Sequence, residues 1–386
     1  MRPSLKDRGT LTDVAKVVGV SVASVSYAFS RPELLSTKLR EKILATARSL
    51  NYPGPNPAAR MLRTGFAGSF AVVYASPLYH VFQDPAASAF LSGVAEACSE
   101  RRLGLLLLQC GEGYESIIRS AAVDGLIIYT MPKDAVTIQT VADRGLPMVV
   151  VDQFLLPNVP FIGIEERAAA RACAQHIKAL GHRRLGIVTF PLHADGYSGP
   201  IDKKRLEKAC FEVARRRLQG YLSVIEPRGP KTSVKIWECL RSSEEDGRTA
   251  AEYFLRKKPR PTAILATSDR LALGVMEVAR RYQLRIPEDL AVVGFDDIPS
   301  AKMSAPQLTT VHQPFEEKGR VAVAALLKEK GPLRTILPTK LIIRQSSDPT
   351  VLGADQERES TYGDMRPEFR QRNNTNDRTP SFPRVK

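Results

Sequence analysis

The chain has 386 residues, of which 43% are apolar and 25% charged, a composition typical of a globular protein with two or three domains. No apolar run approaches about 18 residues, and the N-terminus lacks the apolar segment of a secretory signal. We therefore expect no membrane span and a cytoplasmic location. The five cysteines form no CxxC pair, and their odd number predicts reduced, mostly buried thiols.

The net charge of +15 is concentrated toward the N-terminus. Residues 1–65 hold eleven Lys/Arg against four Asp/Glu, a net of +7, which suits a module that neutralises phosphates. A solvated surface remains the alternative, because charge alone does not decide between them. The arginine run 215–217 and the basic pairs that begin at 183, 257 and 280 are expected on exposed helix ends and faces.

Residues 11–30 have the pattern of two short helices joined by a tight turn. Val14 and Val18 share one face of a first helix, and Gly19 supplies the turn. The predicted inward positions of the second helix are Val20, Val25 and Ala28. Thr10 with Asp13 resembles a capping box for the first helix, and Ser21 is a good N-cap for the second.

A third helix is predicted from Ser36, with an apolar face formed by Leu39, Ile43, Ala47 and Leu50. A helical hairpin inside a larger globular domain is the alternative interpretation of residues 11–30. The three short helices instead favour a small domain of their own. The segment NPAARMLRTG, residues 56–65, joins it to a larger apolar-rich region.

These segments resemble the DNA-binding headpiece and hinge of LacI/GalR-family transcription regulators. The resemblance continues downstream to about residue 345, in LGHRRLGIV (180–188), PTAILATSDRLALGVMEVAR (261–280), IPEDLAVVGFDDI (286–298) and LTTVHQPFEEKG (308–319). It implies a small all-α helix-turn-helix headpiece (10–55), a hinge helix (56–65) and an α/β periplasmic-binding-protein-like domain (66–349) that senses a ligand.

Beyond residue 66 short apolar runs alternate with helical stretches, which predicts parallel sheets covered by helices in two Rossmann-like halves. The predicted strands lie in the segments 68–75, 103–110, 124–130, 146–152, 184–190, 221–227, 262–267 and 290–297. By resemblance the chain crosses between the halves near residues 163, 314 and 342. The N-subdomain then spans about 66–162 and 315–341, and the C-subdomain about 164–313 and 343–349.

The tail, 350–386, is rich in Asn, Arg, Asp, Pro and Ser and poor in aliphatic residues, so we expect it to be disordered. It also lacks the leucine heptads that assemble some family members into tetramers, which favours a homodimer.

The resemblance implies that the second helix of the headpiece enters the major groove of DNA. Val22, Ala23 and Tyr27 then face base edges, while Ser21, Ser24 and Ser26 suit phosphates. The alternative for Tyr27 is a partly buried aromatic staple.

In the hinge, the segment from Ala58 to Thr64 is too short to be a stable helix alone, so we expect it to order on DNA, paired with its dimer mate. The resemblance places Leu62 as a wedge in the minor groove and Ala59 near the groove floor. Packing of Leu62 on its own domain is the alternative.

Five residues match the family's ligand pocket, namely Asp152, Arg205, Ser268, Asp296 and Phe315. Two carboxylates, a guanidinium and an aromatic ring suit a sugar or a nucleobase. Capping of the following turn is the alternative for Asp297 and, to a lesser degree, for Asp296. The family usually has glycine three residues after the arginine, whereas this chain has Lys208 there.

The sequence offers little that points to catalysis. The segment GEGYES (111–116) is incomplete as a dinucleotide-binding motif and is interpreted as a loop, and HExxH, GxSxG and P-loop patterns are absent from the sequence. The histidines are scattered, so we predict no metal, cofactor or catalytic residue. The expected function is a ligand-responsive regulator, most often a repressor in this family, which binds a pseudo-palindromic operator and is nucleoid-associated when DNA-bound. A solute-binding protein or an enzyme on the same scaffold is the alternative, and either would leave residues 10–65 without a purpose.

Overall fold

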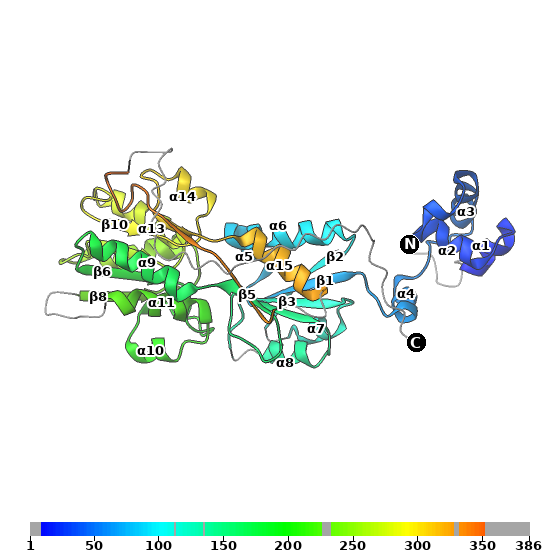
Figure 1. Ribbon diagram of the computed structural model, residues 1–386, viewed down its shortest axis with the longest axis horizontal. Helices are drawn as coiled ribbons and strands as arrows, with labels where there is room; N and C mark the ends of the chain where they lie inside the picture. Colours follow the sequence, from blue (N-terminus) through cyan, green and yellow to red (C-terminus); the bar gives the residue numbers. More distant parts are fainter. Residues whose placement is uncertain (1–8, 112, 134–135, 226–232, 328–331, 352–386) are drawn as a thin grey trace, which may run out of the picture.

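The computed structural model describes residues 9–111, 113–133, 136–225, 233–327 and 332–351. Figure 1 shows a small helical headpiece at one end, a narrow connection, and then two α/β subdomains one after the other. The predicted tail lies outside the described residues from position 352 onward.

The headpiece consists of α1 (Leu11–Val18), α2 (Val22–Ser30), the 3₁₀ turn η2 (Pro32–Leu34) and α3 (Thr37–Ser49). Thr10 and Asp13 form the predicted capping box, and Gly19 ends α1 with a positive φ of 77°. The Ser21 hydroxyl accepts a hydrogen bond from the Ser24 amide at the start of α2. The core of this body is formed by Val14, Ala15, Val18, Val25, Ala28, Ile43 and Ala47, which confirms the predicted helix-turn-helix.

The connection contains one helix, α4 (Pro57–Thr64), whose side chains at 57–60 lie outside the described part of the chain. Where the chain reaches the first sheet, the Asp124 carboxylate accepts hydrogen bonds from the amides of Ala67, Gly68 and Ser69 at 2.7, 2.6 and 3.1 Å. This carboxylate anchors the end of the connection to the loop that precedes β3.

The first subdomain is built on a parallel six-stranded sheet in the order β12-β5-β4-β3-β1-β2. Its strands are β1 (Ser69–Tyr74), β2 (Gly104–Gln109), β3 (Gly125–Tyr129), β4 (Met148–Val151), β5 (Phe161–Ile164) and β12 (Arg334–Leu337). Its helices are α5 (Leu78–Gln83), α6 (Pro85–Glu100), α7 (Glu115–Ser120), α8 (Val136–Ala142) and α15 (Phe315–Leu327). Of the segment GEGYES (111–116), Gly111, Gly113 and Tyr114 lie in the β2–α7 connection and Glu115 and Ser116 begin α7, while residue 112 lies outside the described residues.

The second subdomain has a five-stranded sheet in the order β10-β9-β6-β8-β7, parallel except for the short edge strand β7. Its strands are β6 (Arg184–Thr189), β7 (Gly199–Pro200), β8 (Ser233–Glu238), β9 (Ala263–Ala266) and β10 (Ala291–Val293). Its helices are α9 (Glu166–Ala179), α10 (Lys203–Glu207), α11 (Glu212–Ile225), α12 (Glu244–Arg256), α13 (Asp269–Arg281) and α14 (Pro299–Met303). The alternation of parallel strands and helices in both halves confirms the predicted α/β architecture.

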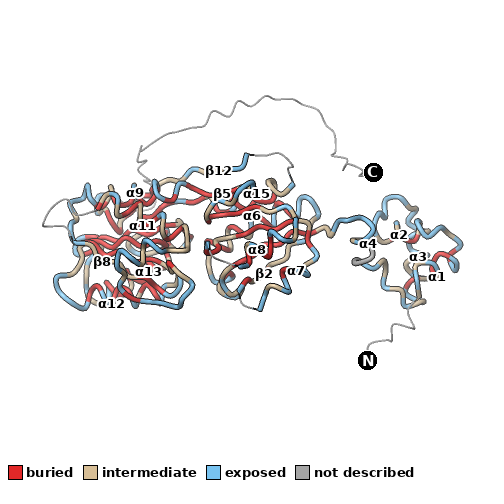
Figure 2. The backbone as a smooth tube through the Cα atoms, turned by 90° about the horizontal axis from the view of Figure 1, so that it is seen from below, coloured by how far each residue is buried: buried red, intermediate tan, exposed pale blue. Residues whose placement is uncertain are grey.

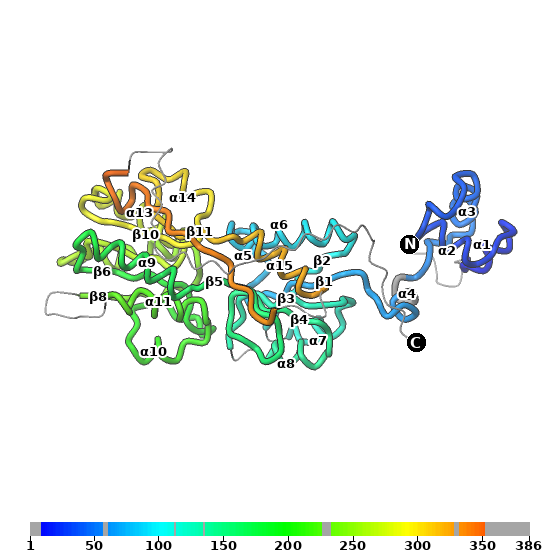
Figure 3. The backbone as a smooth tube through the Cα atoms, in the orientation of Figure 1, coloured from blue at the N-terminus to red at the C-terminus, as the bar shows by residue number. Residues whose placement is uncertain are grey.

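Three segments connect the subdomains, and Figure 3 lets the chain be followed through them. The first follows β5, the second lies between β11 (Thr310–His312) and α15, and the third lies between β12 and β13 (Lys340–Ile342). β11 and β13 pair antiparallel in a small sheet of their own. The third crossing therefore falls at residues 338–339, slightly before the expected position near 342.

One predicted strand is wrong. Within 221–227, the residues Tyr221 to Ile225 form the last turns of helix α11, and the strand of this region is β8. Apolar side chains at helical spacing explain the difference, because Val213, Ala214, Leu218, Tyr221 and Ile225 are all buried. This periodicity outweighs the strand propensity of the short run YLSVI.

Burial follows the two sheets. Figure 2 shows buried backbone along the strands of both subdomains and exposed residues over most of the headpiece surface. Four of the five cysteines are buried, as predicted, and no disulfide joins them in the structure described. In the part of the chain that is described, no single helix is long and apolar enough to cross a membrane. Helices α1 and α2 taken together pass that test, but the pair is bent by 108°.

Candidate DNA-binding face and ligand cavity

The predicted base-reading residues lie on the outer face of α2. Val22 is 44% exposed and Tyr27 38%, and Ala23 beside them is also exposed. Val25 and Ala28 of the same helix face the headpiece core. One side of α2 is thus held by packing while the other is available for contact, as an element that enters a groove requires.

Ser21, Ser24 and Ser26, at the start of α2 and within it, differ in the hydrogen bonds that their polar atoms make. The Ser21 hydroxyl lies 2.9 Å from that of Ser24, and the carbonyl of Ser26 accepts a hydrogen bond from the Ser30 hydroxyl. Ser21 therefore both caps the helix and presents a hydroxyl at its N-terminus, where the helix dipole favours an anion such as phosphate.

Helix α4 presents Leu62 to solvent. Its side chain is 88% exposed, so the alternative in which it packs on its own domain does not hold in this structure. Ala59 lies in the same helix, but its side chain is outside the described residues. The helix is present in the single chain, although α4 has only 8 residues and isolated helices of that length are marginal.

A cavity of about 620 Å³ lies between the two subdomains. The N-subdomain contributes aromatic rings from β1, β3 and α15, and the C-subdomain contributes polar groups from the loops that follow β8, β9 and β10. Of the five predicted ligand residues, four line it, namely Asp152, Ser268, Asp296 and Phe315. These four come from four separate elements, so the fold brings together residues that are far apart in the sequence.

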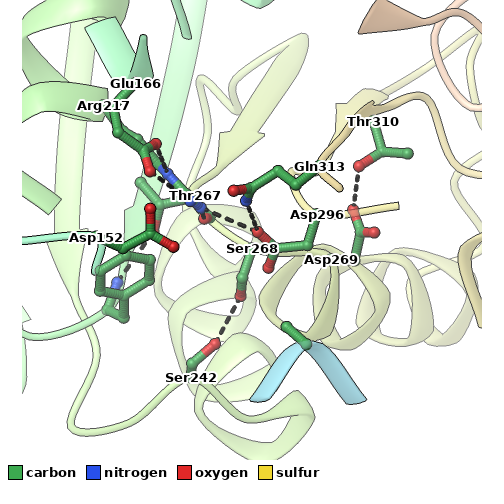
Figure 4. Close-up of polar contacts among 12 residues, drawn as sticks. Asp152, Glu166, Arg217, Ser242, Thr267, Ser268, Asp269, Asp296, Thr310 and Gln313 are labelled. Atoms are coloured by element: carbon green, nitrogen blue, oxygen red, sulfur yellow. Dashed lines mark hydrogen bonds and ion pairs between the residues drawn. The ribbon is translucent and has the colours of Figure 1, made fainter. Parts of the chain in front are cut away.

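Asp296 has the most constrained geometry of the four. It follows β10 with a φ of 121°, a value that side chains other than glycine rarely adopt. Its Oδ1 accepts hydrogen bonds from Arg217 Nη1 at 3.2 Å and from Gln313 Nε2 at 2.7 Å (Figure 4). Among the described residues, both of these donors contact Oδ1 and neither contacts Oδ2, so Oδ2 is available to a ligand. Burial raises the pKa of this carboxyl, and the Arg217 cation opposes that effect.

Asp152 directly follows β4 and has a left-handed conformation with a φ of 49°. Its Oδ2 accepts from Lys318 Nζ at 2.6 Å, and its buried Oδ1 receives no hydrogen bond within the described residues. Lys318 is completely buried and also donates to Gln313 Oε1 at 2.7 Å. The Asp152 carboxylate is thus part of an internal ion pair at the floor of the cavity.

Ser268 caps helix α13, and its hydroxyl lies 2.8 Å from that of Ser242 (Figure 4). Phe315 begins α15 and supplies an apolar wall, together with Tyr129 and Phe190. The buried Tyr74 hydroxyl, also among the lining residues, has no hydrogen-bond partner in the described structure. Hydroxyls, carboxylates and flat rings therefore surround one space.

The prediction for Arg205 is wrong, because this side chain does not line the cavity. It makes two hydrogen bonds of 2.9 Å to Asp195, contacts the buried Glu238 at 2.5 Å, and lies over the Tyr197 ring. All three guanidinium nitrogens of Arg205 thus donate to partners within the C-subdomain. Its role is to fix the loop that precedes α10.

The cavity arginine is Arg217, although its place in the basic run 215–217 predicted an exposed helix face. Its side chain is only 5% exposed, whereas Arg215 and Arg216 are accessible and pair with Glu212. A signal for it was present, because Gly220 follows Arg217 at the three-residue spacing that Lys208 breaks after Arg205. A Cβ at Gly220 would lie 2.4 Å from the carbonyl of residue 167, so only glycine lets α11 pack this closely on α9.

Arg217 connects several groups at the back of the cavity. Its Nε and Nη2 donate to Glu166 at 2.6 and 3.3 Å, and its Nη1 donates to the Thr267 carbonyl at 2.5 Å. Its guanidinium lies 3.7 Å from the centre of the Phe295 ring. Most of its donors are therefore used internally, and Arg217 orients Asp296 at the cavity wall.

The capping alternative for the aspartate pair does not hold. Helix α14 has Ile298 as its N-cap and no side-chain cap bond, while Asp297 pairs with Arg344 at 2.7 Å and His312 at 3.0 Å. Within the ranges that are described, no group of three His, Cys, Asp or Glu side chains could hold a metal ion. His182 contacts the Thr262 hydroxyl at 3.1 Å.

Comparison with known proteins identifies the two kinds of domain. Residues 10–56 match the family of bacterial regulatory proteins, lacI family, and residues 174–347 match a periplasmic binding protein-like domain. An HTH-type transcriptional regulator of Mycobacterium tuberculosis is 39% identical over 359 residues, which cover 90% of this chain and 99% of the relative.

Two solved structures extend the likeness. A LacI-family transcriptional regulator from Corynebacterium glutamicum superposes with a TM-score of 0.67 at 33% identity, covering 89% of this chain and 99% of that one. The lac repressor dimer bound to operator and the anti-inducer ONPF gives a TM-score of 0.69 at 25% identity, covering 88% and 99%. The chain belongs to the LacI family and is a DNA-binding, ligand-responsive transcriptional regulator.

Proposed function

We propose that this regulator binds a pseudo-palindromic operator as a homodimer in the cytoplasm, and that a small polyhydroxylated molecule or nucleobase in the inter-subdomain cavity changes its operator affinity. The working parts are the headpiece (10–55), the hinge (56–65) and the sensor domain (66–349). The observation that carries the ligand half is Asp296, which lines the cavity and whose carboxylate is held by Arg217 and Gln313 through one of its two oxygens.

The DNA half rests on two exposed surfaces. Val22, Ala23 and Tyr27 form an exposed stripe on α2 suited to base edges, and Leu62 is an exposed apolar side chain on a helix that also carries two arginines. An apolar wedge between base steps is worthwhile only where bending the duplex gains further contacts. The similar lac repressor was solved as a dimer on its operator, which supports the same assembly for this chain.

The ligand class follows from the cavity wall. Asp296 Oδ2 accepts hydrogen bonds, the Ser242 and Ser268 hydroxyls donate and accept them, and Phe315 offers a flat apolar surface. A ring that carries several hydroxyl or N–H groups satisfies these groups together, whereas a purely apolar ligand offers no donor to Asp296 Oδ2 and no partner to the serine hydroxyls, which lowers its affinity.

A ligand screen tests this half directly, because Trp237 is the only tryptophan of the chain. It lies on β8, three residues before Leu240 of the cavity lining, and packs against Tyr253 at 4.6 Å. We expect one sugar or nucleobase to change its emission and raise the melting temperature. Asp296→Asn should weaken that ligand by about 10- to 100-fold, since a hydrogen bond to a charged group contributes roughly 1.5–3 kcal/mol.

The matched control is Asp297→Asn, which changes the adjacent carboxylate that pairs with Arg344 and is absent from the cavity lining. It should bind the same ligand within about threefold of wild type, provided that the melting temperature shows a folded protein. Equal losses in both variants would contradict the role assigned to Asp296. An enzyme on this scaffold would instead convert the ligand, which chromatography of the incubated mixture would reveal.

A further inference from the structure

Five buried side chains and Asp296, whose side chain is 12% exposed, form one continuous polar path across the two subdomains. In the N-subdomain, Asp152 pairs with Lys318 of α15. In the C-subdomain, Asp296 pairs with Arg217 of α11, which also pairs with Glu166 at the start of α9. Gln313 lies between these two groups and contacts both. We call this set of six residues the bridge network.

Gln313 has the chemistry that the junction requires. Its carbonyl oxygen accepts from Lys318 Nζ, and its amide nitrogen donates to Asp296 Oδ1, each at 2.7 Å. A side-chain amide carries an acceptor and a donor on two separate atoms, so it can join the Lys318 cation to the Asp296 carboxylate. A carboxylate in its place would repel Asp296, and an apolar side chain would contact neither charge.

The network also meets the segments that connect the subdomains. Gln313 lies on the second crossing, between β11 and α15, and Glu166 follows directly after the first crossing at the end of β5. The third crossing ends at β13, which pairs with β11 beside Gln313 through His312 and Lys340. The Asp296 amide adds a hydrogen bond of 2.9 Å to the Val311 carbonyl of β11. The cavity wall is thus attached to the crossing strands.

We propose that Gln313 is a positioning residue that locks the angle between the two subdomains, and that a ligand at Asp296 acts on the crossing strands through it. The second half rests on the ligand-binding function proposed above. The first half is a property of the free protein. It predicts that breaking the bridge, with both ion pairs left intact, loosens the crossings more than the interior of either subdomain.

The test is hydrogen exchange of the full chain without ligand, in wild type, Gln313→Met and Gln313→Glu. Methionine removes both bridge contacts, while glutamate keeps the acceptor for Lys318 and opposes Asp296. We expect amides of β11 and β13 to exchange about tenfold faster in both variants. In wild type, the opening that exposes these amides must break the hydrogen bonds of Gln313 to two charged groups, whereas each variant lacks at least one of these bonds. Amides of β1 and β9, inside the two sheets, should change by less than about threefold.

Two control variants on α15 separate positioning from general destabilisation. Val323→Ala removes apolar contacts of a buried residue of the N-subdomain, and Arg320→Met breaks an exposed ion pair with Glu96. When the variants are compared at the same melting temperature, neither control should speed up amide exchange in β11 and β13 selectively. Wild-type exchange at these strands in both Gln313 variants, or equal acceleration in Val323→Ala, would overturn the proposal. Because no ligand is added, failure to find a ligand bears only on the proposed function.

Discussion

Lys318→Met should destabilise the sensor domain strongly, and the structure gives the size of the effect. Lys318 is 0% exposed and donates to Asp152 at 2.6 Å and to Gln313 at 2.7 Å. Methionine fits the space of the aliphatic stem but leaves the Asp152 carboxylate buried, with an Oδ1 that already lacks a donor. Removing one member of a buried ion pair costs about 3–5 kcal/mol of unfolding free energy, a large share of the roughly 5–15 kcal/mol of a typical domain.

Urea unfolding, followed by circular dichroism and Trp237 emission, measures this loss. The double variant Asp152→Asn/Lys318→Met removes both charges, and asparagine tolerates the positive φ of 49° at position 152. It should be more stable than Lys318→Met alone, because no unpaired charge remains buried. A loss below about 1 kcal/mol in the single variant, or strict additivity of the two substitutions, would refute the assignment of this pair as a buried ion pair.

Further predictions concern the DNA face, the cavity and a buried acid. Tyr27→Ala should relax specificity at one position in each half-site at a cost of roughly 1–3 kcal/mol there, and equal losses on operator and random duplexes in anisotropy titrations would contradict base reading. Leu62→Ala should weaken operator binding and leave ligand affinity unchanged, as calorimetry with the screened ligand can show. Asp296→Ala should weaken ligand binding by roughly 1–3 kcal/mol and leave operator affinity without ligand near wild type. Unchanged ligand affinity together with a loss of operator affinity, in the same two assays, would contradict this prediction. Burial raises the pKa of Asp269 to about 7, so stability should fall as pH rises from about 4 to about 7, and Asp269→Asn should remove that slope from a series of melts.

Much of the headpiece could be predicted because its signals are local. The capping box at Thr10 and Asp13, the turn glycine at 19 and the apolar positions of α1 and α2 all lie within about twenty residues of sequence. Each helix is therefore specified by its own neighbours. The parallel strands with continuous apolar runs were predictable for the same reason, since burial on both faces leaves a mark in the sequence.

The cavity was predicted only in part. Asp152, Asp296 and Phe315 follow strands or begin a helix within recognisable motifs, whereas Arg217 lies inside a helix whose end resembles a strand. The arginine was assigned to position 205 by resemblance to the family's pocket, and its internal partners Asp195 and Glu238 could not be known from the sequence. The glycine spacing was the one usable signal.

The bridge network is out of reach of local patterns. Asp152 and Lys318 are 166 residues apart, and a lysine in the first turn of an amphipathic helix normally predicts a solvated face. Lys318 is buried because α15 packs against the N-subdomain sheet after the second crossing, which places the residue beside the end of β4. Only the tertiary fold brings the cation to its partner.

The central claim is that one chain couples an operator site to a ligand site. The most direct measurement selects duplexes from a random library with the full chain, and then titrates the selected duplex with and without the compound that shifts Trp237 emission. The account predicts a two-fold symmetric sequence whose affinity changes by about 5- to 150-fold when the compound is added. Selection of no symmetric sequence, or an affinity that no cavity ligand alters, would contradict it.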